Sequence, residues 1–150
     1  MAGRGAQGSR ILHSAGGSTG TFVVIDNVTN IAGPTGQATP IDTTDLLSTG
    51  LENVPDLPDY GNVTLDVNWR GTTKQAALYD MFKNRSEAQS FKIALPEDST
   101  AAEFDVLSFD ASVVGCNFGA QVRGKQSVQF TLKVSGAVTL TQNVASGSLA

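Results

Sequence analysis

The chain of 150 residues contains a single cysteine, Cys116, and a single histidine, His13. One cysteine excludes an internal disulfide and a multi-cysteine metal site, so we expect a chain made in a reducing cytoplasm and stabilised by packing alone. No apolar stretch approaches the roughly 20 residues of a membrane span, and no apolar block of a signal peptide follows the first residues. We therefore expect no membrane association, no metal and no cofactor.

Basic residues are also scarce. The chain has 10 Lys and Arg against 14 Asp and Glu, which gives a net charge of −4. None of the basic residues forms a run, and binding to nucleic-acid phosphates needs clustered Lys and Arg. What the chain does have is 16 glycines and a hydrophobic fraction of 40%. That composition is typical of one β-rich domain with many turns.

Residues with catalytic chemistry are few and isolated. His13 lies in a stretch rich in Gly, Ser and Ala, residues 1–20, which predicts a flexible N-terminal arm. A Ser-His-Asp arrangement needs partners that the sequence does not position. Cys116 falls in a predicted strand, which is typical of a buried structural thiol. We predict that the protein is not an enzyme, and a small hydrolase built on His13 is the enzymatic alternative.

Most of the chain alternates between apolar and polar residues, which predicts strands. Imperfect alternation near Ser108–Ala111 indicates a bulge, residues 97–100 read as a hairpin turn, and residues 141–150 read as a flexible tail. We predict one domain over 1–150 that is mainly β, an antiparallel β-sandwich or rolled sheet with one flanking α-helix. The predicted strands cover residues 21–31, 62–69, 90–96, 102–119 and 126–140.

Only the stretch "TTKQAALYDMFKNR", residues 72–85, has a helical rhythm. Thr72 and Gln75 match a capping box, in which each side chain satisfies a backbone N–H of the other residue. One apolar stripe is predicted to pack on the sheet and close an end of the sandwich, because a helix of about three turns is marginal alone. The stripe consists of Ala77, Leu78, Met81 and Phe82, and the polar side consists of Tyr79, Asp80, Lys83 and Asn84.

Residues 32–61 form a long segment with little periodicity and four of the five prolines. Its carboxylates do not match the spacing of a calcium loop. Loops of this length are usually functional or disordered, but a solvent-only linker rarely carries so many large apolar groups. Two interpretations stay open: these groups fold back onto the core, or they dock on another subunit. The residues concerned are Ile41, Asp42, Asp45, Leu46, Leu47, Leu51, Val54, Pro55, Leu57 and Tyr60.

Four stretches occur in this order: "TFVVIDNVTNIAGP", "TPIDTTDLLSTGLENVPDLPDYGNVTLDVNW", "FKIALPE" and "FDVLSFDASVVGCNFGAQVRGKQSVQFTLKVSGAVT". Together they resemble the major tail tube proteins of long flexible-tailed, lambda-like bacteriophages (siphophages). The similarity covers about residues 10–140. The segment "VPDLPDYG" departs from the family pattern, which often has glycine after the first proline.

The resemblance implies hexameric rings that stack into a tail tube, the conduit through which DNA is ejected into the host. It implies that residues 32–61 are an inter-ring loop and that the two terminal segments reach neighbouring subunits. The implied location is the virion tail, after synthesis in the bacterial cytoplasm. The implied partners are further copies of the chain, tail terminator and tail tip proteins, and a tape measure protein and genomic DNA in the lumen without specific binding.

An acidic lumen would repel phosphate and let a duplex slide without sticking. Candidate acids for this lining are Asp66, Glu103, Asp105 and Asp110. Two alternatives to the main interpretation remain. One is a monomeric immunoglobulin-like decoration or adhesion module, which shares a β-sandwich but needs no helix between its strands. The other is the tube protein of a type VI secretion system.

Overall fold

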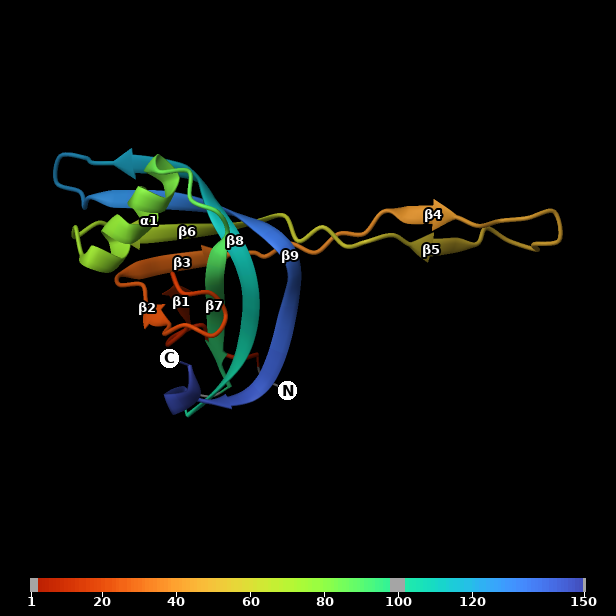
Figure 1. Cartoon of the computed structure of the whole chain (residues 1–150), viewed down its shortest axis with the longest axis horizontal. Coiled ribbons are helices and arrows are strands. Elements are labelled where there is room, and N and C mark those ends of the chain that lie inside the picture. Colours follow the sequence, from red (N-terminus) through yellow and green to blue (C-terminus); the bar gives the residue numbers. More distant parts are fainter. Residues whose placement is uncertain (1–2, 98–101, 150) are drawn as a thin grey trace.

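The computed structural model describes residues 3–97 and 102–149. It consists of one curved antiparallel sheet, one helix and a two-stranded arm that projects far from the body (Figure 1). The seven-stranded sheet has the order β2-β1-β7-β8-β9-β6-β3, and β4 and β5 pair separately in the arm. No helix of the described residues has the length and hydropathy of a membrane span. The elements are β1 Arg10–Ser14, β2 Val23–Val24, β3 Val28–Ala32, β4 Pro40–Asp42, β5 Asn53–Pro55, β6 Asn62–Asn68, α1 Thr73–Lys83, β7 Gln89–Pro96, β8 Glu103–Gly119, β9 Ser127–Ala145 and the short 3-10 helix η1 Ser146–Ser148.

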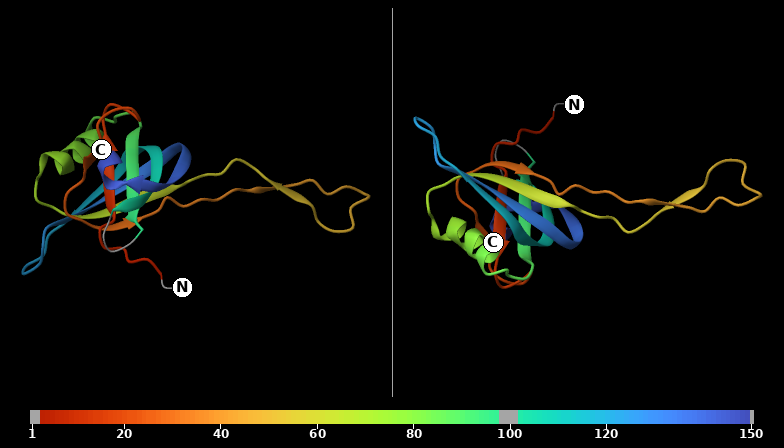
Figure 2. Two further views of the ribbon diagram at one scale, coloured as in Figure 1. Left: turned by 90° about the horizontal axis from the view of Figure 1, so that it is seen from below. Right: turned by 90° about the horizontal axis from the view of Figure 1, so that it is seen from above.

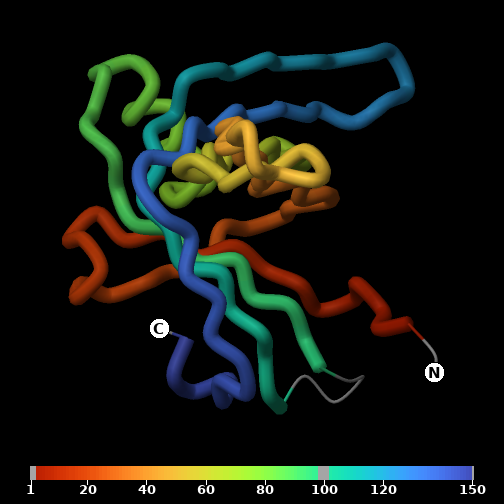
Figure 3. Tube along the Cα trace, turned by 90° about the vertical axis from the view of Figure 1, so that its right-hand side faces the viewer, coloured from red at the N-terminus to blue at the C-terminus, as the bar shows by residue number. Residues whose placement is uncertain are grey.

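Strands β8 and β9 are the longest elements and bend the whole sheet. Their pairing shifts register between Ser108 and Asp110 and again between Val113 and Gly115, and such irregularities increase the bend of a strand. The first shift confirms the predicted bulge near Ser108–Ala111. Figure 3, seen from the side to which the arm points, shows β8 and β9 turning through this bend. The sheet therefore rolls up and brings β3, at one edge, close to β1 near the other edge.

The main core lies inside this roll. Val63, Leu65 and Val67 of β6 all point into it, as the alternation of that strand predicted. On β9, Val128, Phe130, Leu132 and Val134 also point into the main core and Val138 packs against it, but Leu140 is exposed. A smaller apolar cluster lies on the opposite face of the sheet. It consists of Leu12, Phe22, Ala94, Phe104, Val106 and Leu149.

The predicted flexible N-terminal arm is wrong for residues 10–14. This segment is β1, which pairs with β2 on one side and β7 on the other. Ile11 lies in the main core and Leu12 in the smaller cluster. Because both faces of the strand are buried, its side chains lack the polar alternation that reveals a half-exposed strand.

The C-terminal tail and the first predicted strand also need correction. Strand β9 continues to Ala145, which pairs with Glu103, and Leu149 is 3% exposed, so residues 141–149 are held by β8 and by the smaller cluster. The predicted strand 21–31 is broken into β2 and β3, with Asn27 between them at φ 60. Of the predicted turn 97–100, residues 98–100 lie outside the described residues.

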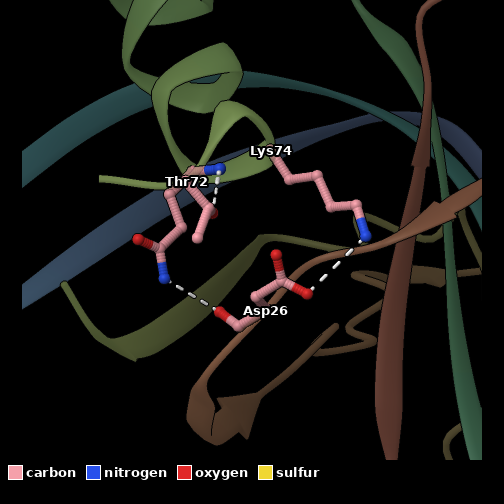
Figure 4. Close-up of polar contacts among 4 residues, drawn as sticks. Asp26, Thr72 and Lys74 are labelled. Carbon is pink, nitrogen blue, oxygen red and sulfur yellow. Dashed lines mark hydrogen bonds and ion pairs between the residues drawn. The ribbon is translucent and has the colours of Figure 1, made fainter. Parts of the chain in front are cut away.

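Helix α1 begins after Thr72, whose Oγ1 accepts a hydrogen bond from Gln75 N at 3.4 Å (Figure 4). Only this half of the predicted capping box forms. The Gln75 side chain is buried, and its Nε2 donates to the backbone carbonyls of Asp26 and Asn68, each at 3.0 Å. Its Oε1 accepts from Arg70 N at 2.9 Å. The Gln75 amide therefore ties the helix to the ends of two strands.

The buried face of α1 differs from the predicted stripe. Leu78 and Met81 enter the main core as expected, and Ala77 is half-buried. Phe82, however, is 40% exposed, and the buried Gln75 takes its place on the packed face. The helix joins β6 to β7, two strands that β8 and β9 separate in the sheet, so these two strands are not hairpin partners.

Candidate assembly surfaces

Residues 32–61 form the arm, which points away from the body in every view (Figure 2). Its two strands pair Ile41 with Val54, and further out along the arm Thr43 N donates to Glu52 O at 2.9 Å. Its large apolar side chains stay in solvent: Leu46, Leu47, Leu51 and Leu57 are 85–103% exposed. Tyr60 alone packs against the main core. The interpretation that these groups fold back onto the core is therefore wrong for the four leucines and holds for Tyr60.

Carboxylates at the tip of the arm stabilise its turns. Asp45 Oδ1 accepts hydrogen bonds from Leu47 N at 2.8 Å and from Ser48 Oγ at 3.1 Å. Asp42 Oδ1 accepts from Thr44 N at 2.9 Å, and hydrogen bonds from Thr44 lower the pKa of the Asp42 carboxyl. Among the described residues no group of three or more potential ligands could hold a metal ion. The acids of the arm tip thus shape the turn.

The arm is fixed to the body at its root, both where the chain leaves the body and where it returns. Gly33 has φ +99, and a Cβ at this position would lie 2.4 Å from Asn62 O, so only glycine fits there. On the returning chain, Asp59 Oδ1 accepts from Gly61 N at 2.9 Å and lies 3.4 Å from Lys133 Nζ. These contacts lower the pKa of the Asp59 carboxyl, the Gly61 hydrogen bond contributing most.

The four candidate lumen acids do not share one face of the sheet. Asp66 points away from the main core, where it accepts from Asn30 Nδ2 at 3.2 Å and Gln129 Nε2 at 3.0 Å. Asp110 lies on the same outer side and accepts from Ser90 Oγ at 2.8 Å. Glu103 and Asp105 alternate with residues of the smaller cluster, so they face the opposite way, and Asp105 pairs with Arg4.

The surface around Asp66 is polar and nearly uncharged. Side chains of β6 and β9 that point away from the main core pair across the two strands, Thr64 with Thr131 and Asp66 with Gln129. The basic group in these two strands is Lys133, which lies beside Asp59. This polar face therefore presents hydroxyl and amide groups with little net charge. Its members on the two strands are Asn62, Thr64, Asp66, Asn68, Ser127, Gln129, Thr131 and Lys133.

An aromatic cluster lies at the end of the molecule opposite the arm, where sequence reasoning predicted no site. The Phe118 ring near the end of β8 meets Trp69 edge-on at 5.1 Å and Tyr79 of α1 at 5.9 Å. A hollow of about 260 Å³ opens beside Trp69 and Phe118. Phe118 is 50% exposed, and Val122 in the following turn is 95% exposed. One feature of the sequence could have indicated this cluster: the large apolar residues Phe118 and Val122 lie at the end of β8 and in the turn that follows.

His13 is a structural residue of β1. Its Nε2 hydrogen-bonds to Gln89 Oε1, its ring stacks on Phe91 at 4.9 Å, and burial lowers the pKa of the imidazole. The hydrolase alternative placed this histidine in a loose arm, which is wrong. Burial also raises the pKa of the Cys116 thiol, which makes it a poor nucleophile at neutral pH.

The sequence matches no known family profile and no curated protein. In three dimensions, however, the chain has the tail tube fold, a mainly antiparallel β fold with one helix. Sequence identity to these structures is low, so the likeness is one of fold. A single rolled sheet with an inserted helix also differs from the two sheets of an immunoglobulin-like domain.

Three solved structures illustrate the likeness. A chain from the tail of an empty gene transfer agent particle, refined with C6 symmetry, superposes with a TM-score of 0.73 at 15% identity, covering 93% of this chain and 99% of that one. The SPP1 tail tube superposes with a TM-score of 0.69 at 14% identity, covering 95% of this chain and 81% of that one. A chain of the PVC sheath–tube complex, an extracellular contractile injection system, superposes with a TM-score of 0.66 at 15% identity. The match covers 89% of this chain and 88% of that one.

Proposed function

We propose that this protein is a structural subunit that assembles into stacked hexameric rings and forms the tail tube of a phage-like particle. The observation that carries the proposal is the arm. It holds exposed leucines far from a body that has the tail tube fold. A monomer gains nothing from a row of apolar side chains in water, whereas a contact between rings would bury them.

In this proposal residues 32–61 connect one ring to the next. Apolar side chains at the tip supply the buried area, and the turn-forming acids hold the tip in shape before contact. The residues assigned to this connection are Ile41, Asp42, Asp45, Leu46, Leu47, Leu51, Val54, Pro55, Leu57 and Tyr60. Residues 3–7 before β1 and the 3-10 helix η1 after β9 are proposed to contact neighbouring subunits of the assembly, since both are exposed on the body.

We assign the lining of the channel to the polar face around Asp66, with Asp110 on the same side of the sheet. A lining with hydroxyls, amides and few free cations gives phosphates little to bind, so a duplex could slide through it. Glu103 and Asp105 face the other way and are not part of this lining. The proposed contents are genomic DNA and a tape measure protein, and the ends of the tube would meet terminator and tip proteins.

The particular particle we propose is the virion of a long flexible-tailed phage, in which the tube conducts DNA during ejection. The tube of a contractile injection system is the second candidate, because the PVC sheath–tube complex shares the fold. Electron microscopy of the assembled particle separates the two, since only a contractile system surrounds its tube with a sheath.

Negative-stain microscopy of the purified chain over a range of concentrations tests the proposal itself. We expect rings or tubes with sixfold symmetry in end-on views. A variant that lacks Leu46–Leu57, with a short turn joining the cut ends, should remain folded and fail to stack. Monomers of the full chain at every concentration would overturn the proposed function.

A further inference from the structure

The two ends of the molecule carry opposite charge. The arm, residues 32–61, contains five acidic residues and no basic one: Asp42, Asp45, Glu52, Asp56 and Asp59. At the other end of the long axis lie α1 and the turn between β8 and β9 (Figure 1). Residues 70–85, which contain α1, and the turn 120–126 hold six of the 10 basic residues against one acidic residue, Asp80, and we call these two segments the basic end: Arg70, Lys74, Lys83, Arg85, Arg123 and Lys125.

Most of these basic groups are free to meet a partner. Lys74 pairs with Asp26 at 3.6 Å, but Lys83, Arg123 and Lys125 are exposed. The aromatic hollow at Trp69 and Phe118 lies between these segments, and Val122 in the turn is exposed. It therefore combines positive charge with apolar surface, whereas the arm combines negative charge with exposed leucines.

We propose that the basic end of one copy receives the arm of a second copy, with leucine side chains in the aromatic hollow and acids facing Lys and Arg. The inference deepens the proposed function, on which it rests, by naming the surface that the inter-ring arm contacts. Opposite placement along one axis makes the contact head-to-tail, and a contact of this kind propagates without closing. The charges give the stack its polarity, because an arm meeting another arm would place acids against acids.

Cross-linking from the arm locates its contact directly. The full chain carries a photo-activated side chain at Leu47, and a matched control carries it at Leu140, which is exposed on β9. After irradiation of assembled protein, we expect adducts from position 47 on peptides of residues 69–85 or 115–126 of another copy, and not from position 140. Adducts from position 47 confined to other strands would overturn the inference.

Charge reversal is the second test of the inference. Glu52→Lys with Asp56→Lys in the arm, or Arg123→Glu with Lys125→Glu in the turn, should each raise the protein concentration needed for assembly by about threefold or more. Combining the four changes should lower the protein concentration needed for assembly again. Salt should weaken wild-type assembly, because it screens exposed charges. Glu103→Lys is the control, since this exposed glutamate lies outside both surfaces.

The outcomes separate the two proposals. Tubes with no effect of either charge reversal and with arm adducts elsewhere would overturn the inference and leave the tube function standing. Head-to-tail filaments without rings, cross-linked between the arm and the basic end, would support the inference and overturn the hexameric tube. Monomers without adducts would overturn both.

Discussion

Lys133 Nζ on β9 lies 3.4 Å from Asp59 Oδ1 at the root of the arm. The contact joins the returning segment of the arm to β9, a central strand of the sheet. Asp59 also receives the Gly61 N–H, so its carboxylate form is favoured in the folded state. The arm is therefore tied to the sheet through a charge that acid can remove.

The first prediction concerns pH. The folded-state pKa of Asp59 lies below its ordinary value of 3.8, so the carboxylate stabilises the fold above that value. This contribution is lost as the pH falls through the lowered pKa. We expect wild type to melt above Asp59→Asn at about pH 7 and the difference to shrink as the pH falls below 3.8. A difference in melting temperature that does not change with pH would contradict this.

The second prediction separates the stability of the monomer from assembly. Leu46, Leu47 and Leu51 make no contribution to the core, because each is at least 85% exposed. Changing all three to Ser should shift the free energy of unfolding by only about 0.5 kcal/mol and should abolish stacking. Denaturant unfolding and sedimentation measure the two effects. Val63→Ser, in the core, is the matched control, and it should lower stability severely.

The third prediction concerns Gln75. Its buried amide bonds Asp26 O, Asn68 O and Arg70 N, so Gln75→Ala leaves backbone groups without partners. We expect a loss of about 2–4 kcal/mol in unfolding free energy. Gln75→Glu, which keeps the size and one acceptor oxygen but removes the amide donor, should also be destabilising. A loss below about 0.5 kcal/mol in Gln75→Ala would show that the amide contributes little.

The fourth prediction compares two apolar residues of α1. Leu78 is fully buried in the main core, whereas Phe82 is 40% exposed. Leu78→Ala should therefore cost about 2–5 kcal/mol, and Phe82→Ala less than about 1 kcal/mol, in chemical denaturation. Equal losses would mean that Phe82 belongs to the packed face after all. If Phe82 contacts a second copy, its substitution should affect assembly more than folding.

Local sequence patterns predicted the elements that have one solvent-exposed face and one buried face. The alternation of β6 and the first half of β9 placed their core residues correctly, and the broken alternation of β8 located its bulge. The N-cap at Thr72 was predicted for the same reason, since capping depends on a few neighbouring residues. The arm was recognised as unusual from its prolines and apolar residues, but not as a hairpin that stays in solvent.

The misplaced elements are those whose environment comes from distant parts of the chain. β1 is buried on both faces because the main core covers one and the smaller cluster covers the other, so its short sequence has no polar alternation to reveal it. Gln75 is buried because carbonyls from two strand ends meet there, an environment that its neighbours in sequence do not reveal. The aromatic cluster needs Trp69, Tyr79 and Phe118, which lie on three separate elements.

The sequence by itself determined a mainly β protein with one capped helix, because period and capping are properties of adjacent residues. It also determined the uneven distribution of charge, with an acidic arm and basic residues around the helix and the last turn. Only the tertiary structure decided that these two charged regions lie at opposite ends of one axis. That arrangement depends on strand order and on the bend of β8 and β9, which bring residues together that the sequence keeps apart.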